Sequence, residues 1–127
     1  MSLSRRVGIA AFVVYTVALV TATHWPGLAI RGPVSRTDLV VHFGAFFVWT
    51  GLLWLSGLVG REAWRLLLVG LAFAVLDETT QPLFRRVFDV LDLVANGAGV
   101  AAASVAAAAW QRRRVRPGRR AGAGGGS

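Results

Sequence analysis

The amino-acid sequence predicts an all-α membrane protein with four transmembrane helices and both termini in the cytoplasm. Of its 127 residues, 55% are hydrophobic and 16% are charged, whereas a soluble domain carries about a quarter charged residues. A water-soluble chain of this length could not bury so much apolar surface. The apolar residues also gather in four long runs, and this grouping sets the expected number of helices.

The four runs lie at 7–23, 39–59, 63–81 and 90–110, and each is flanked by Arg, Pro or Gly. Each has roughly the 17–25 residues that a helix needs to cross a bilayer core of about 30 Å. In lipid, backbone N–H and C=O groups find hydrogen-bond partners only in a helix or a closed β-barrel. No run alternates apolar and polar residues as a barrel strand does, so the runs are predicted to be helices. Residues 1–111 are therefore predicted to form one four-helix transmembrane domain.

The first and the last run each have a distinguishing feature. Residues 7–23 follow Arg5 and Arg6, so a signal peptide is an alternative, although the run exceeds the usual apolar length of about 7–15 residues. Residues 90–110 are rich in Gly, Ala and Ser between Gly97 and Ala107. Because small residues let helix backbones approach closely, this run is expected to present a packed central face.

All fourteen basic residues are Arg, and their placement predicts the orientation. With the N-terminus inside, ten Arg lie on the inner side, and four lie outside: Arg31, Arg36, Arg85 and Arg86. This excess predicts a multi-pass protein of the cytoplasmic (inner) membrane with both termini inside.

The basic residues are concentrated at the C-terminal end. Six Arg fall between Arg112 and Arg120, and a Gly-rich stretch follows them. Residues 112–127 are predicted to form a disordered cytoplasmic tail that attracts anionic lipid. Basic and aromatic residues are not interleaved as on a nucleic-acid-binding face, so no nucleic-acid partner is expected.

Polar residues in or beside the runs converge, in this topology, near the outer membrane surface. The spacing i, i+3, i+7 places Asp89, Asp92 and Asn96 on one helix face, and Asp38 lies one turn before His42. Ionisable groups are costly in lipid and are functional candidates there. The candidate cluster consists of Asp38, His42, Asp77, Glu78, Gln81, Arg86, Asp89, Asp92 and Asn96.

Structural roles for the same residues are the alternative. The acids could form salt bridges with Arg85 or Arg86 that lock the turn before the fourth helix. The His, Gln and Asn of the cluster could be interhelical hydrogen-bonding residues. His24, at the end of the first run, could mark the membrane interface or reach the cluster. No nucleotide loop, nucleophile elbow or paired-His motif is present, and no metal or cofactor is expected.

Three motifs lie within Asp38–Gly99, a stretch of about half of the chain. They are Asp38-Leu-Val-Val-His42-Phe43, Asp77-Glu78-Thr-Thr-Gln81 and Arg86-Val-Phe-Asp89-Val-Leu-Asp92-Leu-Val-Ala-Asn96-Gly-Ala-Gly99. Their joint spacing resembles the VanZ-like family of small bacterial membrane proteins, although Leu39 replaces a Lys that often follows the first Asp. The resemblance implies a four-helix inner-membrane protein whose founding relative is linked to teicoplanin resistance.

We expect the cluster to engage a membrane lipid headgroup or a lipid-linked cell-envelope precursor. Arg86 would pair with a phosphate or carboxylate, and the acids would receive ammonium or hydroxyl groups. The resemblance implies a link to teicoplanin-type glycopeptides but no mechanism; if lower susceptibility is the outcome, it would come from reduced access of the drug at the cell surface. The alternative is an intramembrane hydrolase or transferase for a lipid-linked substrate, with Glu78 or Asp92 and His42 as acid, base or metal ligands. A carboxylate relay in an ion carrier is a third hypothesis.

Overall fold

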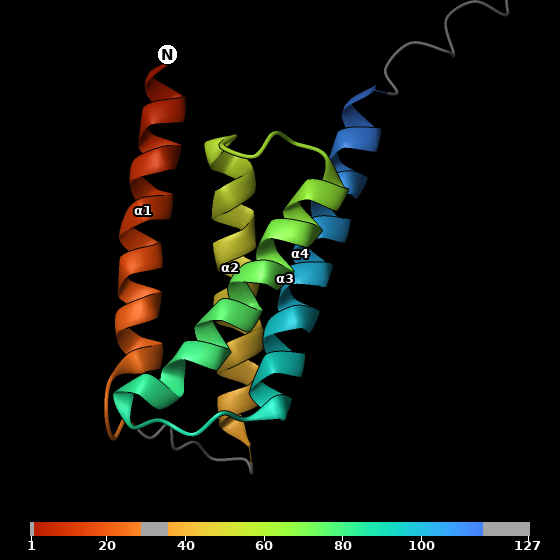
Figure 1. Cartoon of the computed structure of the whole chain (residues 1–127). Coiled ribbons are helices and arrows are strands. Elements are labelled where there is room, and N and C mark those ends of the chain that lie inside the picture. The colour runs from red at the N-terminus through yellow and green to blue at the C-terminus, as the bar shows by residue number, and fades with distance from the viewer. Residues whose placement is uncertain (1, 29–35, 116–127) are drawn as a thin grey trace, which may run out of the picture.

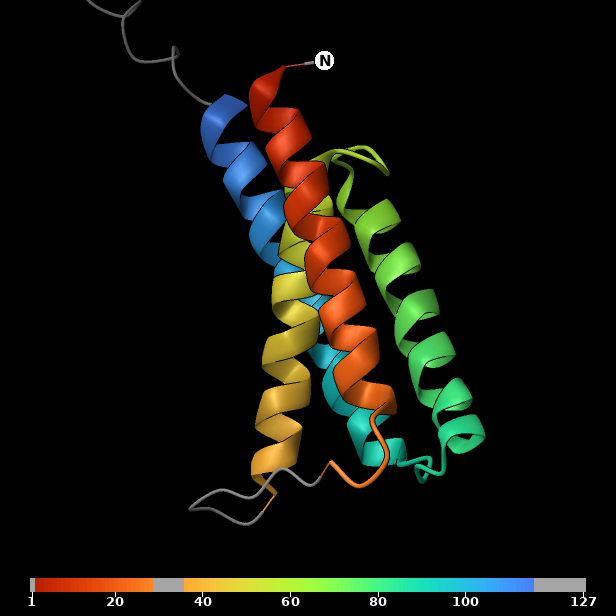
Figure 2. The ribbon, with the colours of Figure 1, turned by 90° about the vertical axis from the view of Figure 1, so that its left-hand side faces the viewer.

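The computed structural model describes residues 2–28 and 36–115. Its elements are α1 (Leu3–His24), α2 (Thr37–Ser56), α3 (Ala63–Thr80), the short 3-10 helix η1 (Gln81–Phe84) and α4 (Val90–Val115). Figure 1 shows that the four long helices run alternately up and down, with η1 turning the chain after α3. Figure 2 shows the same bundle from the side of α1.

The bundle has two chemically different ends. The start of α1, the turn from α2 to α3 and the end of α4 lie together at one end (Figure 1). We call it the arginine end because it carries Arg5, Arg6, Arg61, Arg65, Arg112, Arg113 and Arg114. The opposite end, formed by the end of α1, the start of α2, η1 and the start of α4, is called the polar end.

All four helices are long and apolar enough to cross a membrane. The candidate spans are Leu3–His24, Thr37–Ser56, Ala63–Phe84 and Val90–Arg114. Many large apolar side chains on their outer faces are exposed, for example Val14, Leu68 and Val105. Such a surface is unusual for a soluble monomer and suits contact with lipid. The prediction of an all-α chain with four helices of spanning length is confirmed.

The helix bounds differ from the predicted runs where capping residues decide them. α1 begins at Leu3, since the side chain of Ser2 accepts a hydrogen bond from the backbone N–H of Arg5 at 3.4 Å. α2 ends at Ser56, not 59, because Gly57 adopts a left-handed conformation with φ 66°. α4 continues to Val115, so residues 112–115 of the predicted tail are helical. Residues 116–127 lie outside the described part of the chain.

The contact between α2 and α4 depends on a glycine. A Cβ atom at Gly99 would collide with the carbonyl oxygen of Phe43 and lie 3.0 Å from the backbone nitrogen of Phe47. Ala103 and Ala107, one and two turns further along α4, are also buried. The small-residue run therefore brings the two backbones together, as the sequence predicts.

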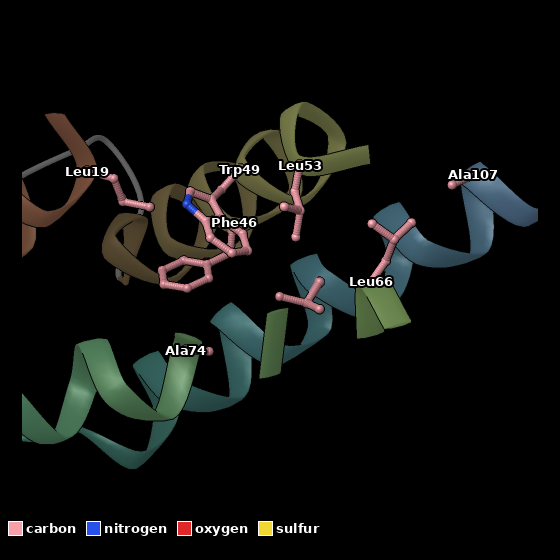
Figure 3. Close-up of a cluster of buried hydrophobic side chains, with 8 residues drawn as sticks. Leu19, Phe46, Trp49, Leu53, Leu66, Ala74 and Ala107 are labelled. Carbon is pink, nitrogen blue, oxygen red and sulfur yellow. The ribbon is translucent and has the colours of Figure 1, made fainter. Parts of the chain in front are cut away.

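The apolar core lies in the middle of the bundle, mainly between α2, α3 and α4 (Figure 3). Phe46 and Leu66 are fully buried. Trp49 stacks on Phe73 with ring centroids 4.3 Å apart. This packing fixes the helices whose polar ends carry the candidate cluster.

α1 is joined to α2 by two polar contacts within the apolar region. The Tyr15 hydroxyl donates to the backbone oxygen of Ala45 at 3.1 Å, and the Trp49 indole N–H donates to Thr16 Oγ1 at 3.0 Å. These bonds hold α1 against α2.

Candidate functional site at the polar end

The first part of the site is a buried histidine between α2 and α4. His42 Nδ1 hydrogen-bonds to Asn96 Oδ1 at 3.0 Å, and His42 Nε2 lies 3.5 Å from Asp92 Oδ2. Asp92 and Asn96 are one turn apart on α4, so they hold both nitrogens of the ring from one helix face. Two atoms of this network, Asp92 Oδ1 and Asn96 Nδ2, are buried and have no hydrogen-bond partner in the described part of the chain.

The second part is a pair of buried carboxylates at the end of α3. Gln81 Nε2 donates to Glu78 Oε2 at 2.9 Å and lies 3.5 Å from Asp77 Oδ2. The backbone N–H of Asp89 donates to Glu78 Oε1 at 2.9 Å, which links α3 to the residue before α4. Glu78 is fully buried and Asp77 is 2% exposed. The hydrogen bonds offset the cost of placing these acids in the interior.

Asp77 also connects α3 to α1, through two residues at the end of α1. Thr23 Oγ1 donates to Asp77 Oδ1 at 2.9 Å, and His24 Nδ1 lies 3.8 Å from the same oxygen. His24 Nε2 is 2.9 Å from Thr80 Oγ1. His24 therefore reaches the cluster, which was one of its two expected roles.

The loops of the polar end carry the remaining predicted residues. Asp89 Oδ2 lies 3.6 Å from Arg36 Nη2, and Asp89 Oδ1 accepts a hydrogen bond from the backbone N–H of Leu91 at 2.7 Å. The Arg86 guanidinium donates to the backbone oxygen of Leu28. Neither Arg85 nor Arg86 forms an ion pair with an acid among residues 2–28 and 36–115, so the alternative of salt bridges from these two arginines is not seen there, and Asp89 pairs with Arg36.

A cavity of about 280 Å³ adjoins the site between α1 and α2. Its walls are mostly apolar, with side chains such as Leu19, Val41 and Tyr15, and its polar lining includes Thr23, His42 and Arg86. A second hollow of about 620 Å³ lies on the other side of α1, where His24, Asp77 and Thr80 meet apolar residues of α3 and η1. Polar residues of the site thus line two mostly apolar hollows, one on each side of α1.

The structure groups the predicted residues unequally. Seven of them join through direct contacts into two networks, one around His42 and one around Glu78; they are His42, Asp77, Glu78, Gln81, Asp89, Asp92 and Asn96. Arg86 stands beside them on the cavity wall. Asp38 is partly exposed at the start of α2, outside both networks.

Sequence reasoning missed Thr23, Thr80 and Arg36. A single Thr in an apolar run carries no signal of a polar partner, and Arg36 gave none beyond its charge. His24 was named, but a lone His beside Trp25 looks the same whether it marks an interface or joins a cluster.

Chemically, the arrangement separates supporting groups from available ones. The carboxylate oxygens of Asp77 and Glu78 accept hydrogen bonds from groups inside the protein. Arg86 retains donors for an anion, whereas the unpartnered Asp92 Oδ1 and Asn96 Nδ2 are buried and do not line the cavity. In the part of the chain that the structure describes, no group of three or more His, Asp and Glu side chains could hold a metal ion.

Comparison with known proteins bears on this arrangement. The family model described as VanZ/LLP1 matches residues 9–111, which include all of α2 and α3, most of α1 and α4, and every residue of the candidate cluster. No curated protein and no solved structure matches the chain. Because the match covers most of the sequence, from within α1 to near the end of α4, the chain belongs to the VanZ/LLP1 family.

Proposed function

We propose that the polar end binds the phosphate-bearing headgroup of a membrane lipid or a lipid-linked envelope precursor at the outer face of the cytoplasmic membrane. The observation that carries the proposal is Arg86 on the wall of a largely apolar cavity between α1 and α2. A guanidinium forms paired hydrogen bonds with phosphate, and its charge has no acidic partner among the described residues. The apolar wall suits the lipid chain attached to such a headgroup.

The buried network beside the cavity supports recognition of a polar headgroup. His42, which Asp92 and Asn96 hold in place, is the member of this network that lines the cavity and can contact the headgroup. Asp77 and Glu78 act as supports that hold α1, α3 and α4 around the cavity. The acids thus contribute mainly by positioning, and Arg86 supplies the charge that selects the ligand.

Binding of an envelope precursor would account for resistance to glycopeptides of the teicoplanin type. A precursor held at the outer membrane surface is less accessible to a drug that approaches from outside. The effect depends on occupancy of the site and therefore on Arg86.

The test combines drug susceptibility with direct binding. In a strain in which the chain raises the inhibitory concentration of teicoplanin, Arg86→Ala should return it to the empty-vector value. Purified Arg86→Ala should retain farnesyl phosphate about tenfold less than the parent protein in native mass spectrometry, because one charge-assisted contact to a phosphate is lost. The matched control is Arg85→Asn, which removes the neighbouring charge and tolerates the left-handed conformation at that position, φ 62°. Equal behaviour of the two variants at normal expression would contradict the proposal.

A second candidate function is hydrolysis or transfer on a lipid-linked substrate. The pair of His42 and Asp92 favours it, because a carboxylate beside an imidazole is a common general-base arrangement. Against it, both ring nitrogens already face partners within the protein. Lipid mass analysis of cells that express the parent chain or His42→Gln decides the matter: an enzyme yields a lipid species that the variant lacks, and a binding protein yields none.

A further inference from the structure

The arginine end contains a hollow of about 670 Å³ between the turn from α2 to α3 and the last turns of α4. It lies at the opposite end of the bundle from the candidate site. Two arginines line it, Arg61 from the turn and Arg114 from α4, together with Trp54 and Trp110. Basic and aromatic side chains therefore share one concave surface, although the two Arg–Trp pairs come from segments about 50 residues apart in sequence.

Each of the two arginines lies over the face of a tryptophan. The guanidinium carbon of Arg61 is 5.7 Å from the ring centroid of Trp54, and that of Arg114 is 4.7 Å from the ring centroid of Trp110. A guanidinium that stacks on a ring keeps the N–H groups at its edge free for an anion. The side-chain amide of Gln111 donates to the backbone oxygen of Arg61, which fixes the turn against α4.

The charges of this hollow do not cancel. Its lining contains one acid, Glu62, which lies 3.6 Å from Arg65. Neither Arg61 nor Arg114 has an acidic partner within residues 2–28 and 36–115. Two of the three arginines around this acid therefore remain unneutralised, and the hollow favours an anion.

The walls next to these arginines are mostly apolar. An adjacent hollow of about 630 Å³ shares Leu55 and Arg61 with the first and continues along α1 and α2 past Leu52, Ala11 and Val7, and its other polar lining residues are Ser2, Ser4, Arg5 and Ser56. Tryptophans are frequent at the level of lipid headgroups, and three of the five in the chain lie under arginines at this end. A soluble phosphate would contact the arginines but not the apolar walls. A phospholipid would contact both, through its phosphate and its acyl chains.

We infer that the arginine end holds an anionic phospholipid. Arg61 and Arg114 bind its phosphate, Trp54 and Trp110 orient the two guanidiniums, and an acyl chain lies along the apolar hollow beside Leu55. The site is distinct from the Arg112–Arg120 run as a whole, because it requires Arg114 and Arg61 together rather than basic charge alone. It is also independent of ligand binding at the polar end.

The experiment measures lipid retention by the full-length protein in native mass spectrometry, with phosphatidylglycerol and phosphatidylcholine added in detergent. The parent protein should retain phosphatidylglycerol in preference. Arg114→Gln should lower that retention about fivefold and Arg61→Gln/Arg114→Gln about 25-fold, because phosphate-binding arginines near a membrane surface each contribute about a fivefold factor. Arg113→Gln is the matched control, since it removes the same charge one residue away, outside the hollow, and should leave retention within twofold.

Three results would overturn the inference. Equal losses in Arg113→Gln and Arg114→Gln would mean that only the total charge matters. Equal retention of phosphatidylcholine would remove the selectivity for an anionic lipid. Displacement of the lipid by glycerol 3-phosphate at concentrations similar to those of the lipid would indicate a site for a free phosphate ester. Arg114 lies near the exposed end of α4, so its single variant stays informative even if the double variant does not fold.

Discussion

The buried side chain of Asp77 connects α3 to other elements of the bundle. Its two oxygens face partners from different elements, Thr23 on α1 and Gln81 at the start of η1. The neighbouring Glu78 points about 100° away around α3, as consecutive helical residues do, and reaches the backbone N–H of Asp89. The two adjacent acids thus connect the end of α3 to α1 and to the residue before α4.

The bond between Thr23 and Asp77 predicts a measurable loss of stability in Thr23→Val. Valine keeps the shape of the side chain but leaves a buried carboxylate oxygen without its donor, which should lower the free energy of unfolding by about 1–2 kcal/mol. Thr21→Val is the control, because the Thr21 hydroxyl is exposed and bonds only within its helix, to the backbone oxygen of Val17. Its cost should stay below about 0.5 kcal/mol. Unfolding by SDS in mixed micelles measures both, and similar losses would show that Asp77 does not depend on α1.

The sequence predicts which residues form the candidate site better than it predicts which of them contact one another. The spacing of Asp92 and Asn96 places them on one face of α4, and this is the face that holds His42. Their partner could not be predicted, because the height of His42 relative to α4 depends on how closely the two helices approach. Thr23 gave no signal at all, since its role exists only when α1 meets α3.

At the scale of elements, the register between α2 and α4 depends on Gly99. The backbone of α2 passes so close that no side chain fits there, which sets the level at which His42 meets Asn96. The sequence could predict a small-residue face on α4, because Gly and Ala recur along it. Which glycine touches the neighbouring backbone could not be predicted, since Gly97 and Gly99 look alike in the sequence.

These two glycines allow a matched test of the helix contact. Gly99→Ala should destabilise the bundle by about 1–3 kcal/mol or more, because the new methyl group meets the backbone of Phe43 and Phe47, which cannot move aside. Gly97→Ala meets only the end of the flexible Leu71 side chain at 3.4 Å and gains helix propensity, so it should be neutral or slightly stabilising. The same SDS titration compares them. A loss in Gly97→Ala as large as that in Gly99→Ala would place the close contact elsewhere.

At the scale of the whole molecule, the acids of the chain lie almost entirely at one end of the bundle. Five of the six acids lie at the polar end, and Glu62 alone lies at the arginine end. The net charge of +8 therefore describes neither end. The fold class and the number of helices follow from apolar run lengths, which is why they could be predicted well. Helix ends were less accurate, because caps such as Ser2 and Gly57 act locally.

The same separation predicts the orientation in the membrane, which labelling of introduced cysteines measures. The chain has no Cys, so every signal comes from the substitution. Val87→Cys at the polar end is 84% exposed before substitution, and Ser4→Cys lies exposed at the arginine end. Since arginine-rich ends stay in the cytoplasm, an impermeant maleimide should label Val87→Cys in intact cells and Ser4→Cys only after permeabilisation. The opposite pattern would turn the cavity beside Arg86 toward the cytoplasm. Binding at the outer membrane face would then be wrong, whereas the phospholipid site at the arginine end would remain and would face the outer leaflet.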